Sequence, residues 1–371
     1  MKNDIIIIST CDWSGLWYQR QHLACQFALH GHKIYYFNRT LQRWPTINHL
    51  LIRLSYIKSE IEDIYVPDNI KIITPIAGPP LKMIRFLNKR LLKNSIKCYK
   101  FKEPIIVSYL PTYNALDLID LINPIMVAYI NEHNYDAMKI IPGLIDSERE
   151  LIKTANVICA DSKFNRERLK KISDGKMVYP SLPGVYYNEF KQAYRGNEIY
   201  RKKNIYYFGL IENYLNLNLY IELSIYFEIV FIGRIAPGMR KKIPPSIKVR
   251  PPVFNRDLPH QLREADIIGL FYVNSPYIRG VIPAKLFECI ATKKPILVSG
   301  LEEAKPYSDI LYDVQGSLNM AYDIINSLQI SETNQKLQKK DLIAKEADWK
   351  NRYDYLHRIL KLNYPLKHKD S

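Results

Sequence analysis

The feature that most constrains the fold is a regular alternation of short apolar runs with helical segments. Residues 4–9 (DIIIIS) are a β-branched run typical of a buried strand. A loop and a helical pattern that stops at Gly31 come next, followed by a second strand-like run, KIYYFNRT. This order predicts a βαβ unit, in which the strands are parallel and the connection is right-handed.

The alternation continues along the chain and is interrupted once. Residues 172–193 carry glycine, proline and turn residues that break both periodicities, and we expect an interdomain linker there. The sequence therefore predicts an α/β protein with two Rossmann-like, doubly wound domains, at residues 1–180 and 181–345, with ligands at the carboxyl ends of the strands and in a cleft between the domains. The other expected strands are 104–110, 124–130, 155–161, 204–210, 228–235, 246–253, 266–273 and 295–300, and the expected helices include 114–121, 145–153, 162–171, 258–265 and 284–292.

Composition excludes several classes of protein. The chain has 371 residues, of which 47% are hydrophobic, so it can bury two cores. No apolar run is long enough for a membrane-spanning helix, and the apolar stretch near the start is too short for a signal peptide. Five scattered cysteines without a C-x-x-C pair argue against a disulfide framework and for a reducing, cytoplasmic location.

The net charge of +16 calls for an anionic partner, and it is concentrated in one segment. Residues 81–102 hold eight Lys or Arg and no acidic residue, and six of them recur at steps of three and four, on one face of a helix. A basic amphipathic helix of this kind commonly lies on anionic lipid, and the alternative is a solvated surface helix. No nucleic-acid-binding motif accompanies the charge, so we expect no nucleic acid partner. The residues expected to contact the membrane are Lys82, Arg85, Lys89, Lys93, Lys97 and Lys100.

Candidate phosphate-binding residues come from the second domain. The G-x-G-x-x-G and Walker motifs are absent, and no D-x-D pair is present to hold a divalent cation, so we expect no metal and no cofactor. Lys285 and Glu288 stand three apart at the start of an expected helix, after a loop with Arg279. A lysine and free N–H groups suit a diphosphate, and a carboxylate suits the two hydroxyls of a ribose. The alternative is an ordinary surface pair of opposite charges.

Several segments resemble GT-B-fold nucleotide-sugar glycosyltransferases. KLFECIATKKPILVSG is similar to their K-L-x-E-Y-x-A-x-G-K-P-V segment, and WYQRQHLACQFALHGHKIYYFN to their first helix. ERELIKTANVICADSKFNRERL, MVYPSLPGVYYNEF and IYYFGLIENYLNLNL follow in the family's order, and DWKNRY resembles the final helix that returns to the first domain, here within 346–371. The likeness is greatest to bacterial capsule, exopolysaccharide and teichuronic-acid enzymes of the family-4 type.

The resemblance implies roles for particular residues of the second domain. Glu288 takes the position of the ribose carboxylate, and the basic residues and a glycine take positions near the diphosphate: Lys285, Arg279, Arg234 and Gly209. The chain departs from the family pattern at Gly280, where many relatives have a second acidic residue, and at 132–135, where an acidic pair is usual. Inverting and retaining chemistry both stay open.

The first domain offers candidates for the base and for the acceptor. An inverting transfer needs a base for the acceptor hydroxyl, and the loop AYINEHNYDAM offers Glu132, His133 and Asp136. Each of these is alternatively a residue that caps the following helix. The loop DWSGLWYQR offers a glycine and aromatic faces that stack on sugars or lipid tails. The alternative is that Trp17 is a core residue and Arg20 is solvated. The acceptor-side candidates are Trp13, Gly15, Trp17 and Arg20.

These observations predict a metal-independent glycosyltransferase. The expected partners are a nucleotide sugar, a lipid-linked saccharide acceptor of bacterial surface polysaccharide synthesis, and the anionic inner leaflet of the plasma membrane. Two alternatives remain: a catalytically inactive GT-B protein that assembles with partners or binds membranes, and a nucleotide-sugar 2-epimerase.

Overall fold

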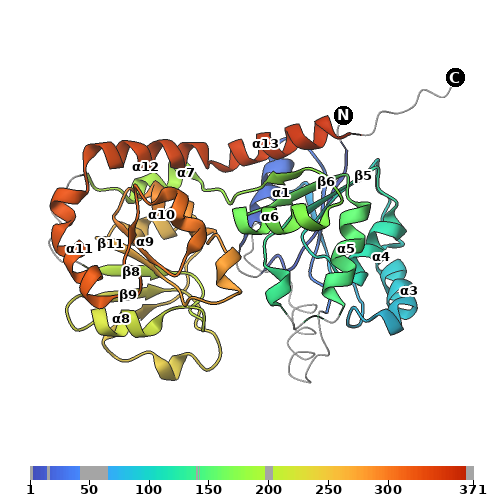
Figure 1. The fold of residues 1–371 in the computed structure, drawn as a ribbon. Helices are drawn as coiled ribbons and strands as arrows, with labels where there is room; N and C mark the ends of the chain where they lie inside the picture. The colour runs from blue at the N-terminus through green and yellow to red at the C-terminus, as the bar shows by residue number, and fades with distance from the viewer. Residues whose placement is uncertain are drawn as a thin grey trace. The chain divides into compact units, whose positions relative to one another are not determined.

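The computed structural model describes residues 3–14, 17–41, 66–138, 141, 143–196 and 204–364. The chain forms two compact units, and the first unit is discontinuous: it consists of Met1–Leu182 and Trp349–Ser371, with Pro183–Asp348 forming the second. Each unit contains one parallel β-sheet with helices on its faces (Figure 1). All ten strands expected from the apolar runs are present.

The first unit is built on a seven-stranded sheet with the order β3-β2-β1-β4-β5-β6-β7. β1 is paired on both sides, with Ile5 opposite Ile34 in β2 and opposite Ile105 in β4. All four residues of β1 are buried, which explains why its sequence is a continuous apolar run. The strands are β1 (Ile5–Ile8), β2 (Ile34–Phe37), β3 (Ile70–Ile73), β4 (Ile105–Ser108), β5 (Met126–Asn131), β6 (Val157–Ala160) and β7 (Val178–Pro180).

Helices of the first unit cover the sheet, and the last helix of the chain is one of them. α13 (Trp349–Leu362) packs along α1 (Gln19–Leu29), where Trp349 stacks on His22 (Figure 1). This explains why α1 is buried nearly all round although it is rich in polar residues. Ser162 caps α6 as expected, because its side chain accepts a hydrogen bond from the Asn165 N–H at 3.1 Å. The remaining helices are η1 (Lys82–Ile84), α3 (Arg85–Ile96), α4 (Tyr113–Ile122), η2 (Tyr135–Ala137), α5 (Leu144–Thr154) and α6 (Lys163–Ile172).

The second unit repeats this plan with six strands in the order β10-β9-β8-β11-β12-β13. In Figure 1, α8 lies on the opposite side of the sheet from α9 and α10. The expected linker at 172–193 is partly regular structure: β7 extends the first sheet, and α7 belongs to the second unit. The elements are α7 (Tyr187–Phe190), η3 (Lys191–Ala193), β8 (Ile205–Phe208), α8 (Leu217–Leu223), β9 (Ile229–Ile232), η4 (Arg240–Lys242), β10 (Ile247–Arg250), α9 (Leu258–Leu262), β11 (Ile267–Phe271), η5 (Ile278–Gly280), α10 (Lys285–Ala291), β12 (Ile296–Ser299), η6 (Glu302–Tyr307), β13 (Tyr312–Asp313), α11 (Leu318–Ser331) and α12 (Asn334–Glu346).

Candidate functional site

Two glycines leave the backbone bare at the carboxyl edge of the second sheet. Gly209 directly follows β8 and Gly233 directly follows β9, with φ of +111° and +151°. A Cβ on Gly233 would lie 1.9 Å from the carbonyl oxygen of Gly209, and a Cβ on Gly209 would lie 2.5 Å from the Nζ of Lys285. Both positions therefore require glycine, and the close approach brings the Lys285 ammonium onto the end of β8.

Lys285 is the first residue of α10 and reaches back to the sheet. Its Nζ donates hydrogen bonds to the hydroxyl of Tyr207 at 2.9 Å and to the carbonyl oxygen of Phe208 at 2.5 Å. The ammonium also lies 4.2 Å from the centre of the Tyr207 ring. Burial lowers the pKa of Lys285 to about 8. The strand end thus holds a cation that is close to losing its proton.

Glu288 lies one turn further along α10 and is bound by a residue that the sequence analysis missed. The Nδ2 of Asn255, in the loop before α9, donates to one carboxylate oxygen at 2.8 Å. Burial raises the pKa of Glu288 to about 7, although Asn255 and Lys285 both favour the ionised form. Among the contacts of the described residues, none joins Lys285 to Glu288 as an ion pair, so the alternative of a simple surface pair does not describe them.

Arg234 and Arg279 are exposed basic residues at the same edge of this sheet. Arg234 follows Gly233, and Arg279 lies in η5, shortly before α10. In the described part of the chain, neither guanidinium has a hydrogen-bond or ion-pair partner. Both cations are therefore available to an anion from solvent.

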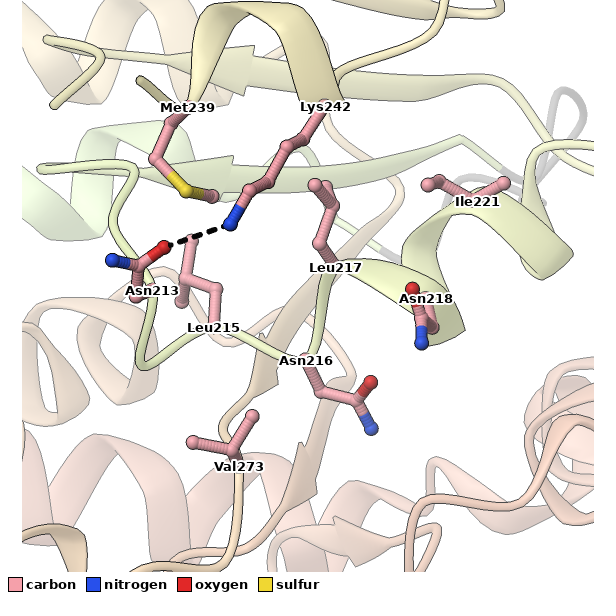
Figure 2. Close-up of a pocket in the computed structure, with 9 residues that line it drawn as sticks. All are labelled: Asn213, Leu215, Asn216, Leu217, Asn218, Ile221, Met239, Lys242 and Val273. Atoms are coloured by element: carbon pink, nitrogen blue, oxygen red, sulfur yellow. Dashed lines mark hydrogen bonds between the residues drawn. The ribbon is translucent and has the colours of Figure 1, made fainter. Parts of the chain in front are cut away.

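A cavity of about 290 Å³ opens at this carboxyl edge, in the loops after β8, β9 and β11. Figure 2 shows Lys242 reaching across it to Asn213, whose Oδ1 accepts a hydrogen bond from the lysine Nζ at 3.2 Å. Asparagine amides and aliphatic side chains make up most of its wall. The lining residues are Asn213, Leu215, Asn216, Leu217, Asn218, Ile221, Met239, Lys242 and Val273.

The first sheet carries a buried ion pair at its carboxyl edge. Arg20 is 3% exposed, and its Nη1 donates to the Oε2 of Glu132 at 2.7 Å and to the hydroxyl of Thr10. The guanidinium also lies over the rings of Tyr18 and Tyr109. Burial is the largest single influence on Arg20 and would lower its pKa, but the Glu132 carboxylate together with Cys11, Tyr36 and Tyr109 outweighs it, and the pKa is raised. The alternative of a solvated Arg20 is therefore wrong.

His133 follows Glu132 directly and is held in its neutral form. Burial lowers the pKa of His133 to about 4, and the positive charge of Arg20 adds to the effect. A neutral imidazole can accept a proton at physiological pH. By contrast, the carboxylate of Glu132 is engaged by Arg20.

The structure corrects the interpretation of Asp136 as a free base. Its Oδ2 lies 3.0 Å from the Nε of Arg168, and Arg168 also binds the buried Glu148. Tyr129 donates to Glu148 at 2.6 Å and completes this network. Asp136 therefore balances the charge of Arg168.

The prediction that the Trp13 side chain faces the acceptor is wrong. Its side chain is 1% exposed and packs edge-on against Trp17 and Tyr36, at 5.3 and 5.0 Å between ring centres. It is a core residue of the first unit. Trp17 is partly exposed and also contacts His22. Gly15 lies outside the described residues.

Two of the six basic residues expected at a membrane are engaged within the first unit. The Nε of Arg85 lies 2.8 Å from the Oδ1 of Asp117, and Lys89 pairs with Asp120, both acceptors being on α4. Lys82, Lys93, Lys97 and Lys100 are exposed. The basic face of the helix is therefore turned partly toward α4 and not wholly toward solvent.

The described residues contain neither a metal-binding cluster nor a helix able to span a membrane. No group of three or more His, Cys, Asp or Glu side chains there is placed to hold a metal ion. None of the described helices combines the length and the apolar character that crossing a membrane requires.

Sequence reasoning missed Asn255, Tyr207, Thr10 and Tyr109. The positions of the last three follow from topology. Tyr207 lies in β8, Thr10 comes two residues after β1, and Tyr109 comes directly after β4. Polar residues at the ends of central parallel strands were the available signal. Asn255 lies in a loop with no regular pattern, so no signal marked it.

Solved structures with the same fold include several glycosyltransferases. Sucrose-phosphate synthase from Thermosynechococcus elongatus superposes with a TM-score of 0.72 at 11% identity, covering 97% of this chain and 98% of the other. Anabaena HepE in complex with UDP and glucose gives 0.70 at 8% identity, covering 97% and 100%. A glycosyltransferase from Rickettsia africae gives 0.66 at 15% identity, covering 99% and 100%. No family model and no curated protein sequence matches the chain. The full-length likeness confirms the predicted fold class, the two-domain GT-B arrangement.

Proposed function

We propose that this chain is a glycosyltransferase that moves a sugar from a nucleotide-diphosphate donor to an acceptor hydroxyl. The observation that carries the proposal is the placement of Lys285 beside the bare backbone of Gly209 and Gly233, with the carboxylate of Glu288 one turn further along α10. A cation and a carboxylate at the strand ends match the two ends of a nucleoside diphosphate, its phosphates and its ribose. The GT-B fold of the chain supports this assignment.

In the proposed donor site, the acidic and the basic side chains bind different parts of the nucleotide. Glu288 accepts the ribose hydroxyls, with Asn255 orienting the carboxylate. Transfer breaks the bond between the anomeric carbon and the diphosphate oxygen, so negative charge grows on the leaving diphosphate. Lys285, Arg234 and Arg279 stabilise that charge without a metal ion.

The acceptor groups come from the first unit. In an inverting transfer the acceptor oxygen forms the new bond to the anomeric carbon, and its proton passes to His133, which is neutral near pH 7. Arg20 and Glu132 hold the loop that carries the histidine. We propose a lipid-linked saccharide as the acceptor and the inner face of the plasma membrane as the location, because the exposed lysines of η1 and α3 suit anionic lipid.

Calorimetry with UDP, GDP and CMP in the absence of metal tests the donor site. We expect one nucleotide to bind and Glu288→Ala to weaken it by about 1.5–3 kcal/mol, the cost of a hydrogen bond to a charged group. Glu346→Ala, at an exposed glutamate of α12, is the matched control and should leave binding unchanged. If none of the three nucleotides binds to the wild-type protein, the donor assignment fails.

The alternative of a nucleotide-binding protein without catalysis is favoured by one observation. The Lys285 ammonium is already bonded to Tyr207 and Phe208 of its own unit. If this arrangement persists, the protein binds a nucleotide sugar without turnover, and Lys285→Ala complements a strain lacking the wild-type gene. Release of UDP from UDP-glucose in the presence of acceptor lipids, lost in Lys285→Ala, excludes this alternative. The 2-epimerase alternative predicts a change in the sugar with no transfer.

A further inference from the structure

The outward face of η1 and the first turns of α3 is apolar. Met83 is 95% exposed, Phe86 84% and Leu87 55%, and the three stand at positions i, i+3 and i+4 of consecutive helical turns. Side chains at these positions share one face of a helix. Large apolar side chains gathered in this way usually mark a site of association.

The opposite face fixes the helix to the first unit. Asn88, Leu92 and Ile96 are buried, and Arg85 and Lys89 are bonded to the aspartates of α4. Figure 1 shows α3, α4 and α5 side by side in this unit. The helix therefore cannot turn its apolar face inward without breaking these contacts.

Basic side chains surround the apolar residues, and acidic side chains are absent from this stretch. Lys82 precedes them, and Arg90, Lys93 and Lys97 follow on the same outward face, all exposed. Residues 69–102 contain no Asp or Glu. Ile76, which is also exposed, lies beside the last turns of α3, where its N–H donates to the Ser95 hydroxyl at 3.0 Å.

We propose that this surface, formed by η1 and the outward face of α3, docks on an anionic lipid bilayer. Met83, Phe86 and Leu87 enter the boundary of the acyl chains, while Lys82, Arg90, Lys93 and Lys97 lie at the lipid phosphates. Long, flexible cations around an apolar tip suit a fluid charged interface. The side chains of Met83, Phe86 and Leu87 offer no polar group for the specific hydrogen bonds of a protein interface. The docking rests on the membrane location given in the proposed function and assigns the surface that makes the contact, but it does not depend on sugar transfer.

Flotation with vesicles tests the docking on the full-length chain. We expect binding to vesicles of phosphatidylcholine mixed with phosphatidylglycerol and much weaker binding to phosphatidylcholine alone. Met83→Ser with Phe86→Ser should weaken binding by about tenfold or more, because the buried apolar area is lost. Ile330→Ser, at an equally exposed apolar residue of α11, is the matched control. Lys93→Glu with Lys97→Glu should weaken binding by about thirtyfold, and Lys241→Glu should not.

A second measurement reports insertion directly. Phe86→Trp should gain fluorescence that brominated lipids quench, whereas the four native tryptophans are the background measured in the wild type. Binding that is unchanged by Met83→Ser with Phe86→Ser, or equal on neutral vesicles, would overturn the proposal, as would a Phe86→Trp signal that lipids leave unquenched. Nucleotide calorimetry on the same variants separates the two proposals: loss of lipid binding with retained nucleotide binding tests docking alone.

Discussion

The carboxyl edges of the two sheets both hold buried charged side chains, but these side chains are partnered differently in the two units. In the first unit Arg20 and Glu132 are brought together and pair at 2.7 Å. In the second unit Lys285 and Glu288 share one face of α10 without pairing, and a bare glycine backbone lies beside Lys285. One edge has its charges satisfied by its own side chains, whereas the other keeps two charges that a ligand can satisfy.

The pKa values reflect this difference. Burial penalises every charged group and raises the pKa of Glu132, but at Arg20 the neighbouring groups outweigh burial and the pKa is raised. In the second unit the neighbouring groups offset burial only in part, so the pKa of Lys285 is lowered to about 8 and that of Glu288 is raised to about 7. Groups without an ion-pair partner that titrate near neutrality are typical of binding and catalysis. The paired edge is typical of a framework.

The largest effect should come from breaking the buried pair. Arg20→Met leaves the Glu132 carboxyl buried without its partner, and we expect a loss of about 3–5 kcal/mol in the free energy of unfolding of the first unit. Arg39→Met is the matched control, because Arg39 pairs with Asp12 at 3.2 Å but is 55% exposed, and it should cost at most about 1 kcal/mol. Urea unfolding measures both, and equal costs would contradict the comparison.

The second edge should be sensitive to added volume. Gly233→Ala places a methyl group against the carbonyl of Gly209, and we expect about 3 kcal/mol of destabilisation in the second unit from overpacking and strain. Gly238→Ala is the control, since φ there is +81° and nothing lies within 4 Å of the added Cβ. It should cost only about 1 kcal/mol of backbone strain. Urea denaturation that ranks the two variants equally would show that the close approach is unimportant.

The buried histidines of the first unit and Glu288 of the second should respond to acid in opposite directions. Burial lowers the pKa of His22 to about 3 and that of His133 to about 4, so below about pH 6.5 the unfolded chain binds these protons first. For these groups the first unit therefore loses stability as pH falls from 6.5 to 4, by at most about 1.4 kcal/mol per pH unit for each histidine.

Glu288 acts in the other sense, because its pKa is higher in the folded state. The folded second unit binds that proton from about pH 7, whereas the unfolded chain does so near 4.5, so stability rises as pH falls between these values. Hydrogen exchange, analysed separately for the core strands of each unit at pH 7 and pH 5, measures the divergence. Parallel changes in the two units would contradict it.

The smallest effect concerns the affinity of the proposed donor site. Binding of UDP-glucose should strengthen as pH rises through about 7, where Glu288 ionises, and weaken above about 8, where Lys285 loses its proton. Each limb should be no steeper than about tenfold per pH unit. Glu288→Gln should remove the limb near pH 7 and keep the one near pH 8. Calorimetry at several pH values would reveal a flat profile if neither group meets the ligand.

The two folds were predictable from the sequence because buried parallel strands are written as continuous apolar runs. β3 was missed because it contains the exposed Lys71, and β7 because Pro180 and its neighbours suggested a linker, although proline is tolerated in an edge strand. The candidates Lys285 and Glu288 came from their spacing together with the resemblance to GT-B glycosyltransferases. Their contacts with Tyr207 and Asn255 could not be predicted from the sequence, because these partners belong to distant elements and no local pattern marks them.

Helical periodicity located the basic face at 82–100 but could not tell which part of it meets the protein. Asp117 and Asp120 stand three apart on α4. This spacing was the available signal that two basic residues of α3 would form ion pairs within the first unit. The exposure of Met83 and Phe86 depends on where α3 is anchored, which is a property of tertiary packing.

The discontinuity of the first unit has a consequence for biosynthesis. α13 covers α1, yet the ribosome makes it only after the whole second unit. During translation, the face of α1 that α13 later covers therefore stays exposed to water until the second unit has been synthesised. A polypeptide whose synthesis stops before α13 therefore keeps that face of α1 exposed.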